Sequence, residues 1–235
     1  MTENNEKPTV SWAVPEELGI PPDTLRLRLN FFHQATEMVY FQGDTVITKM
    51  VDAMDIAHAL SRELNFNTGL LPENTLWWVN SRDGQIFAIY VEPKVRRLGL
   101  QTDLEKPVQR FNIPLPGFIF LCSPGKAPWV VACTSRPTKE TDIIYHSPLF
   151  NVYRNGRSCG GSNKYPVRVA EIPESFFVSF FTAEGDAKDR SKKYPKNILQ
   201  LWKALDGTEK FPYDDLVPFG TVADLMKFGS RGEEA

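Results

Sequence analysis

Alternating apolar and polar positions predict that the chain begins with β structure. Over residues 25–32, leucines and a phenylalanine alternate with arginines and an asparagine, which is the period of a half-buried strand. The apolar runs between residues 38 and 50 flank Gln42-Gly43-Asp44, a sequence typical of a hairpin turn. We therefore expect an N-terminal β extension over residues 11–50, preceded by a polar, disordered N-terminus over residues 1–10.

A helix and then a four-stranded antiparallel meander are predicted next. Asp52 is a helix-capping residue type, and apolar residues at four-residue spacing would share one face of a helix that reaches residue 64. Two apolar runs separated by a turn sequence indicate a second hairpin over residues 76–92. Strands at residues 117–121 and 129–134, joined by a proline-bounded turn, complete the meander.

The chain changes to helical patterns in its last third. Pro173 suits a first helical turn, and the phenylalanines that follow it predict a helix with an apolar face. Pro195 is expected to open a second helix that ends at Gly207, and a short helix is expected over residues 221–228. Strands and helices together predict the α+β class. The phenylalanines of the first helix are Phe176, Phe177, Phe180 and Phe181.

Size and composition narrow the class of protein. A chain of 235 residues is long enough for a main domain, expected over residues 51–229, with a tail over residues 230–235. The formal charge of −2 gives no electrostatic reason for direct contact with nucleic acid or an anionic membrane. No apolar run approaches the roughly 20 residues of a membrane span. The basic run over residues 188–196 is interpreted as a solvated loop.

Cysteine usage points to a reducing compartment and to one candidate nucleophile. The three cysteines have no paired spacing and no histidine cluster, so we expect a cytoplasmic protein without a metal site or cofactor. Cys122 and Cys133 lie in apolar runs that read as buried strands. Cys159 follows Gly156-Arg157-Ser158 and precedes Gly160-Gly161, which is loop composition, so its thiol is expected to be exposed.

An asparagine, Asn151, lies eight residues before Cys159, with an Asn-Gly turn between them. This arrangement resembles the active-site segment of ubiquitin-conjugating enzymes, and the predicted order of elements resembles their fold from about residue 51 to 205. The proline turn over residues 123–128 resembles their Tyr-Pro-x-x-Pro-Pro turn. The resemblance departs at Leu149, which occupies the place of the histidine in the usual His-Pro-Asn triplet.

A closer resemblance is to the bacterial family called PRTRC system protein B, a prokaryotic ubiquitin-conjugating-like family. It implies a ubiquitin-like protein and an adenylating activating enzyme as partners, with a JAB-type metallopeptidase as a further candidate. Direct contact with nucleic acid or membrane is not implied. The segments that carry this resemblance are 70–74, Trp77-Trp78, 145–152, 156–159, 176–182 and 211–218.

The resemblance implies that Cys159 forms a thioester with the C-terminus of a ubiquitin-like protein and then passes it to an amine. A thiolate is a strong nucleophile, so a histidine base is not required. For Asn151 two roles stay open: its amide N–H would stabilise the negatively charged carbonyl oxygen, or its side chain would brace the loop by hydrogen-bonding local backbone carbonyls. An inactive module of the same fold that binds a ubiquitin-like protein is the alternative function.

Five further residues are candidates for supporting roles. His146 lies five residues before Asn151 and takes part in an aromatic-histidine pair with Tyr145. Arg157 and Tyr153 lie within the loop, and an arginine near a thiol favours the thiolate electrostatically. Gly160 and Gly161 are small enough to let an extended peptide tail lie against the backbone.

Overall fold

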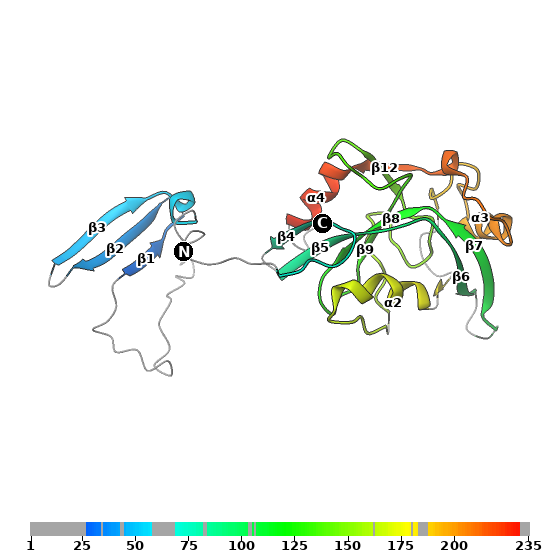
Figure 1. Cartoon of the computed structure of the whole chain (residues 1–235), viewed down its shortest axis with the longest axis horizontal. Coiled ribbons are helices and arrows are strands. Elements are labelled where there is room, and N and C mark those ends of the chain that lie inside the picture. The colour runs from blue at the N-terminus through cyan, green and yellow to red at the C-terminus, as the bar shows by residue number, and fades with distance from the viewer. Residues whose placement is uncertain are drawn as a thin grey trace, which may run out of the picture. The chain divides into compact units, whose positions relative to one another are not determined.

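The structure, a computed structural model, divides the chain into two compact units, Met1–Gly69 and Leu70–Ala235 (Figure 1). In the part of the chain that the structure describes, each unit is built mainly of strands and helices are few, which is the predicted α+β class. Among the described residues no helix is both long enough and apolar enough to cross a membrane. The residues that the structure describes are 27–33, 35–42, 45–57, 69–81, 84–102, 105, 107–161, 163–179, 181–182 and 188–230.

The N-terminal unit contains a three-stranded antiparallel sheet in the order β1-β2-β3. Its strands are β1 (Leu27–Phe31), β2 (Thr36–Gln42) and β3 (Thr45–Val51). Gln42 pairs with Thr45, so β2 and β3 form the predicted hairpin. The strand predicted over residues 25–32 is also confirmed where the structure describes it.

A helical turn over residues 53–57 follows β3. The carboxylate of Asp52 accepts a hydrogen bond from the Met54 backbone N–H at 2.7 Å, which confirms the predicted cap. The rest of the predicted helix, the predicted N-terminus and residues 231–235 of the predicted tail lie outside the described residues, whereas Ser230 belongs to the last helix rather than to the tail. The boundary between the two compact units lies after Gly69 rather than after residue 50, so this helical turn belongs to the N-terminal unit. The boundary after residue 50 stays a prediction.

A six-stranded sheet forms the centre of the second unit, in the order β12-β10-β9-β8-β5-β4. The second predicted hairpin is confirmed as β4 and β5, and the two strands predicted after it are confirmed as β8 and β9. These four strands are antiparallel neighbours in the sheet. Two strands of four residues extend this sheet and were too short to be predicted. The bounds are β4 (Thr75–Ser81), β5 (Gly84–Val91), β8 (Gly117–Cys122), β9 (Trp129–Cys133), β10 (Ile143–His146) and β12 (Pro218–Thr221).

A second sheet of the same unit, in the order β11-β6-β7, was not predicted. Its strands β6 (Lys94–Gln101) and β7 (Gln109–Leu115) form a hairpin inserted between β5 and β8. Basic residues in β6 and a proline in β7 obscure the alternation that would have revealed them. The two-residue strand β11 (Phe181–Thr182) runs parallel to the end of β6.

The helix predicted after Pro173 is shorter than expected. Helix α2 (Ile172–Val178) ends before Ser179, whose backbone is extended and whose hydroxyl donates to the Phe176 carbonyl at 2.6 Å. The prediction was therefore wrong for Phe181, which lies in β11. Phe180 lies outside the described residues.

The next helix begins later than predicted. In α3 (Ile198–Leu205), Asn197 is the N-cap, because its side-chain oxygen accepts the Leu199 N–H at 2.8 Å. Pro195 precedes this cap. The last helix, α4 (Val222–Ser230), is confirmed, and the short 3-10 helices are η3 (Val169–Glu171) and η4 (Tyr213–Asp215).

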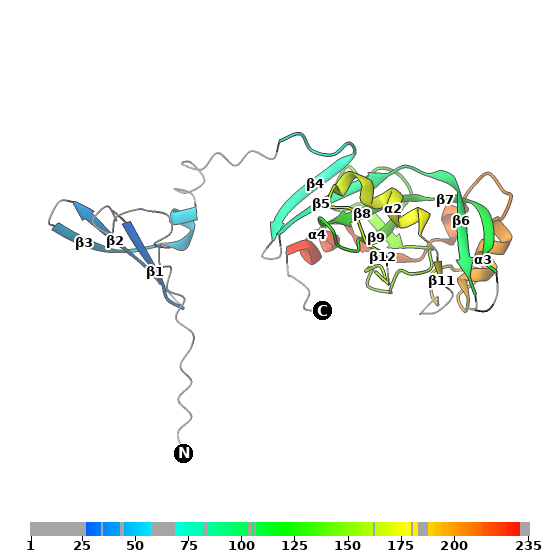
Figure 2. The same ribbon diagram turned by 90° about the horizontal axis from the view of Figure 1, so that it is seen from below.

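Helices cover both faces of the six-stranded sheet. On one face, Phe118 and Phe120 of β8 meet Phe177 and Phe176 of α2 at ring-centroid distances of 5.8 Å and 5.5 Å. Figure 2 shows α2 lying across β8 on this side. On the other face, alternate residues of β8 and β9 form a second core with Val222 and Leu225 of α4. The central strands are therefore buried on both sides, as their near-continuous apolar sequences indicate.

Candidate active site

Residues 151–159 form a small antiparallel hairpin that pairs the two principal candidates. The backbone N–H of Cys159 donates to the Asn151 carbonyl at 2.7 Å, and the N–H of Tyr153 donates to the Arg157 carbonyl at 2.7 Å. Val152 pairs with Ser158 between them. The eight-residue spacing seen in the sequence thus places Asn151 directly opposite Cys159.

Alternation along this hairpin separates a buried face from an exposed one. Val152 and Ser158 point inward and are 5 % and 2 % exposed. Since successive side chains point to opposite sides of a strand, their neighbours share the outer face. This outer face carries four residues that the sequence analysis singled out: Asn151, Tyr153, Arg157 and Cys159. The Cys159 thiol is exposed, as expected.

The turn of the hairpin depends on its Asn-Gly pair. Asn155 accepts the Arg157 N–H through its side-chain oxygen at 3.0 Å. Gly156 has a φ of +91°, and its carbonyl accepts the Val130 N–H at 2.7 Å. A Cβ at this position would lie 3.4 Å from a methyl group of Val131. Glycine is therefore required by conformation as well as by the close approach to β9.

Two buried groups hold the inner face of the hairpin. The Ser158 hydroxyl and backbone N–H both donate to the Pro128 carbonyl, at 2.6 Å and 3.0 Å, which fixes the hairpin to the proline turn before β9. Arg190 donates from Nη2 to the Val152 carbonyl at 2.9 Å and is only 2 % exposed. The interpretation of the basic run as a solvated loop was therefore wrong for Arg190, whose guanidinium is a structural donor.

The side chain of Asn151 ties the hairpin to the second sheet. Its oxygen accepts hydrogen bonds from both the backbone N–H and the hydroxyl of Thr182 in β11, each at 3.0 Å. Asn151 has a φ of +60°, a conformation that asparagine adopts more readily than most residues. Asn151 thus connects the hairpin to a distant strand through donors of Thr182, whereas the bracing expected from the sequence used local backbone carbonyls.

Two tyrosines lie beside the Cys159 thiol. The Tyr153 hydroxyl lies near Cys159, and the influence of this thiol is the main cause that raises the pKa of Tyr153 above its usual value. The nearby charge of Arg157 acts in the opposite direction. Burial is the main cause that raises the pKa of Tyr165, and the nearby side chains of Asn163 and Ser158 act in the opposite direction. No pattern in the sequence had singled out Tyr165.

His146 interacts with the turn of the hairpin, at the other end from the Asn151–Cys159 pair. Burial, followed by the charges of Arg190 and Arg154, lowers the pKa of His146 to about 4, so its ring is neutral at pH 7. The ring packs edge-on against Phe219 at 5.1 Å and bonds the Arg154 backbone. His146 is thus placed to support the turn.

The residue in the place of the expected histidine belongs to the core. Leu149 is 2 % exposed, and the carbonyl of the preceding Pro148 accepts the indole N–H of Trp202 at 3.0 Å. Phe150 packs edge-on against the same indole at 5.0 Å. This segment therefore anchors the start of the hairpin to α3.

Gly160 and Gly161 continue directly from the nucleophile candidate. A Cβ at Gly160 would meet the Cβ of Ala127 at 3.5 Å, an ordinary contact, and Gly161 has a φ of +49°. The Gly160 carbonyl accepts the Asn163 N–H at 3.0 Å, which forms a turn. The path of a peptide tail along these glycines stays a prediction. Within the described ranges no group of three or more His, Cys, Asp or Glu side chains is arranged to hold a metal ion.

The two remaining cysteines are packed into the central sheet, as predicted. Cys122 is 0 % exposed and faces the α2 side, whereas Cys133 is 1 % exposed and faces the α4 side. Burial raises the pKa of Cys133 to about 12 and raises that of Cys122 further. Both thiols are therefore protonated and inaccessible at neutral pH.

A model of prokaryotic E2 family D matches residues 47–219, which include the whole hairpin. The chain belongs to this family. Searches of curated proteins and of solved structures each gave no match. The match to prokaryotic E2 family D begins within β3, so it includes the helical turn after Asp52 as well as the larger unit. The protein is thus E2-like, and its candidate nucleophile lies inside the family region.

Proposed function

We propose that this protein is a ubiquitin-conjugating-like transferase in which Cys159 carries the C-terminus of a ubiquitin-like protein as a thioester. The observation that carries the proposal is the contrast among the three cysteines of an E2-like chain. Cys159 alone is exposed, on a hairpin face shared with Asn151 and Tyr153, whereas Cys122 and Cys133 are buried.

The reaction takes place in two acyl transfers. The Cys159 thiolate attacks the carbonyl carbon of a thioester on the activating enzyme; a new C–S bond forms, and the enzyme's thiolate leaves. An amine then attacks the same carbonyl carbon, a C–N bond forms, and Cys159 departs as a thiolate. The amine proton passes to solvent. No redox step or cofactor is needed, because the acyl group arrives already activated.

The surroundings of Cys159 suit this chemistry. A thiol reacts as its thiolate and is intrinsically nucleophilic, so an adjacent base is not necessary. The neutral His146 acts at the turn as a structural residue in this proposal. Asn151 acts by bracing the hairpin against Thr182. Gly160 and Gly161 leave the backbone accessible to the arriving tail.

The finer assignments follow the same proposal. The four neighbouring strands β4, β5, β8 and β9 form the meander of a ubiquitin-conjugating fold, with the β6–β7 hairpin as an insertion. Within its family the chain is of the PRTRC system protein B type, and it is a bacterial, cytoplasmic protein. Its partners are a ubiquitin-like protein, an adenylating activating enzyme and a JAB-type metallopeptidase, without direct contact with nucleic acid.

A second candidate function is a binding module that holds a ubiquitin-like protein without forming a thioester. Two observations favour it. Leu149 is buried where ubiquitin-conjugating enzymes have a histidine, and the Asn151 side-chain oxygen is engaged by Thr182. Such a module would use the same exposed hairpin for a noncovalent contact.

Reconstitution with the activating enzyme, ATP and the ubiquitin-like protein distinguishes the two functions. We expect a reductant-sensitive adduct on gels that is lost in Cys159→Ala and retained in the matched control Cys133→Ala. Cys159→Ser should form a reductant-resistant oxyester, because the hydroxyl replaces the thiol as the attacking group. Stable binding without an adduct in any of these proteins would establish the binding module instead.

A further inference from the structure

Tyr153 and Cys159 are diagonal neighbours on the outer face of the hairpin. The ladder pairs Tyr153 with Arg157 and Asn151 with Cys159. Diagonal positions on one face of an antiparallel pair are within reach of an aromatic side chain. Both side chains are exposed on this face, and Cys159 is the main influence on the pKa of Tyr153, so the phenol lies close to the thiol.

The Tyr153 hydroxyl is suited to act as a hydrogen-bond donor during the reaction. The nearby Cys159 raises the pKa of Tyr153, so the hydroxyl keeps its proton at neutral pH. Tyr153 is 46 % exposed, which leaves room for an acyl group and an amine beside it. A phenol that retains its proton can stabilise a negative oxygen without entering the proton balance.

Other residues that would serve as donors in an E2-like site have other roles here. Asn151 directs its side-chain oxygen to two donors of Thr182, which fixes the plane of its amide. Leu149 is buried in the core, and His146 bonds the backbone at the turn of the hairpin. Of the two tyrosines beside the thiol in the described part of the chain, Tyr165 is buried, whereas Tyr153 lies on the exposed face with Cys159.

We propose that Tyr153 is a catalytic residue whose hydroxyl donates a hydrogen bond to the carbonyl oxygen of the acyl group held by Cys159. This role rests on the proposed transferase function. When the amine lone pair adds to the carbonyl carbon, the C=O π electrons move to oxygen, and the Tyr153 hydroxyl stabilises the resulting charge. As the C–S bond breaks, the same hydroxyl stabilises the departing Cys159 thiolate, and the amine proton is lost to water.

The geometry favours this role because sulfur and the reacting oxygen are close together. In a thioester both atoms are bonded to the same carbon, so a donor in contact with Sγ reaches the oxygen by a small side-chain rotation. Loss of one oxyanion donor in a preorganised enzyme site typically costs about 10²–10³ in rate. Tyr153 is half exposed, so we expect a smaller effect, about tenfold.

A chemical thioester tests this role without the natural partners. The full-length protein is incubated with the diglycyl thioester of 2-mercaptoethanesulfonate, freed of excess reagent, and mixed with lysine, and intact mass spectrometry follows acylation and deacylation. We expect Tyr153→Phe to lose its acyl group to lysine about tenfold more slowly than wild type. Acylation should slow less, because exchange between thiols has a lower barrier than attack by an amine.

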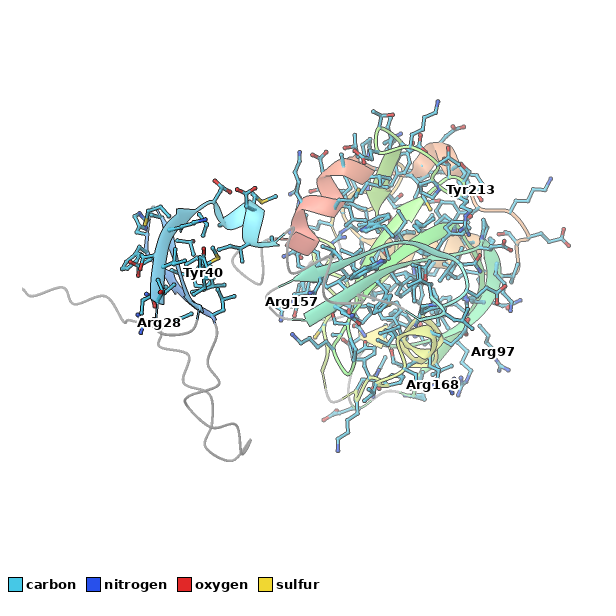
Figure 3. The ribbon with its side chains drawn as sticks, turned by 60° about the vertical axis from the view of Figure 1, so that its left-hand side comes forward. Arg28, Tyr40, Arg97, Arg157, Arg168 and Tyr213 are labelled. Atoms are coloured by element: carbon cyan, nitrogen blue, oxygen red, sulfur yellow. The ribbon has the colours of Figure 1, made fainter. Side chains whose placement is uncertain are left out.

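Tyr213→Phe is a matched control, since Tyr213 is 38 % exposed and lies on the opposite side of the unit from Arg157 in Figure 3. It should behave like wild type. Deacylation of Tyr153→Phe within threefold of wild type, or equal slowing of both steps, would overturn the role of Tyr153 and leave the transferase function standing. Wild-type protein that takes up no diglycyl group at Cys159 would overturn both.

Discussion

The central strands β8 and β9 and the hairpin over residues 151–159 present cysteines in opposite ways. Cys122 and Cys133 lie on strands whose residues are almost all buried, between helices that cover both faces of the sheet. Cys159 lies on a hairpin that buries one face only. The difference shows that the chemistry available to a thiol here is decided by whether its strand has an uncovered side.

Thiol alkylation is expected to reveal the largest difference between these regions. In the native protein at pH 8, iodoacetamide should modify Cys159 at least about a hundredfold faster than Cys122 or Cys133, because only a thiolate reacts and burial keeps both sheet thiols protonated. Peptide mass spectrometry measures the three rates. In denaturant the rates should become similar. Equal rates in native buffer would contradict the burial of the sheet cysteines.

The inner face of the hairpin is expected to contribute strongly to stability through Arg190. Arg190→Met removes the donor to the Val152 carbonyl and leaves this buried oxygen without that bond, so we expect a loss of about 3 kcal/mol in the free energy of unfolding. Urea titration followed by fluorescence measures it. Arg168→Met is the control, because the Arg168 side chain is 83 % exposed and should change stability by less than about 0.5 kcal/mol.

The exposure of Cys159 could be predicted from the sequence because its signals are local. Asn151, Tyr153, Arg157 and Cys159 lie in one short segment whose Asn-Gly turn determines its pairing. The four-stranded meander was likewise predicted, since each of its strands is a separate apolar run.

The contacts that hold the hairpin in place could not be predicted, because they connect distant parts of the chain. Arg190 is 38 residues from the carbonyl it bonds, and Thr182 is 31 residues from Asn151. A basic residue within a basic run has the sequence pattern of a solvated loop, and only the tertiary structure distinguishes it. Helix α2 ends early for the same reason, since the pairing of Phe181 with β6 competes with further helix.

The contact between the hairpin and β11 is expected to contribute less than Arg190. Asn151→Ala removes the acceptor for both Thr182 donors and puts a residue less tolerant of positive φ at +60°, so we expect a loss of about 2 kcal/mol. Asn151→Gly also removes the acceptor, but glycine adopts a positive φ readily. This variant therefore separates the loss of the hydrogen bonds from the backbone strain. Thermal and urea unfolding compare them. A glycine variant as unstable as the alanine variant would show that conformation contributes little.

The smallest expected effect is the pH dependence of the contact between β10 and the turn of the hairpin. His146 faces Arg190, Arg154 and Asp189, and its pKa in the folded state is about 4, below the unfolded value of about 6.5. A depressed histidine pKa means that the unfolded chain binds the proton more readily. Its contribution is therefore complete above pH 6.5 and is lost as the pH falls toward 4.

Because the ring is about half buried, we expect wild type to lose about 1 kcal/mol more stability than His146→Gln between pH 7 and pH 5. Urea titrations at the two pH values measure this difference, and Arg168→Met should follow wild type. A parallel loss in wild type and His146→Gln would show that the imidazole is solvated. The contact between β10 and the turn of the hairpin would then be independent of the protonation of His146.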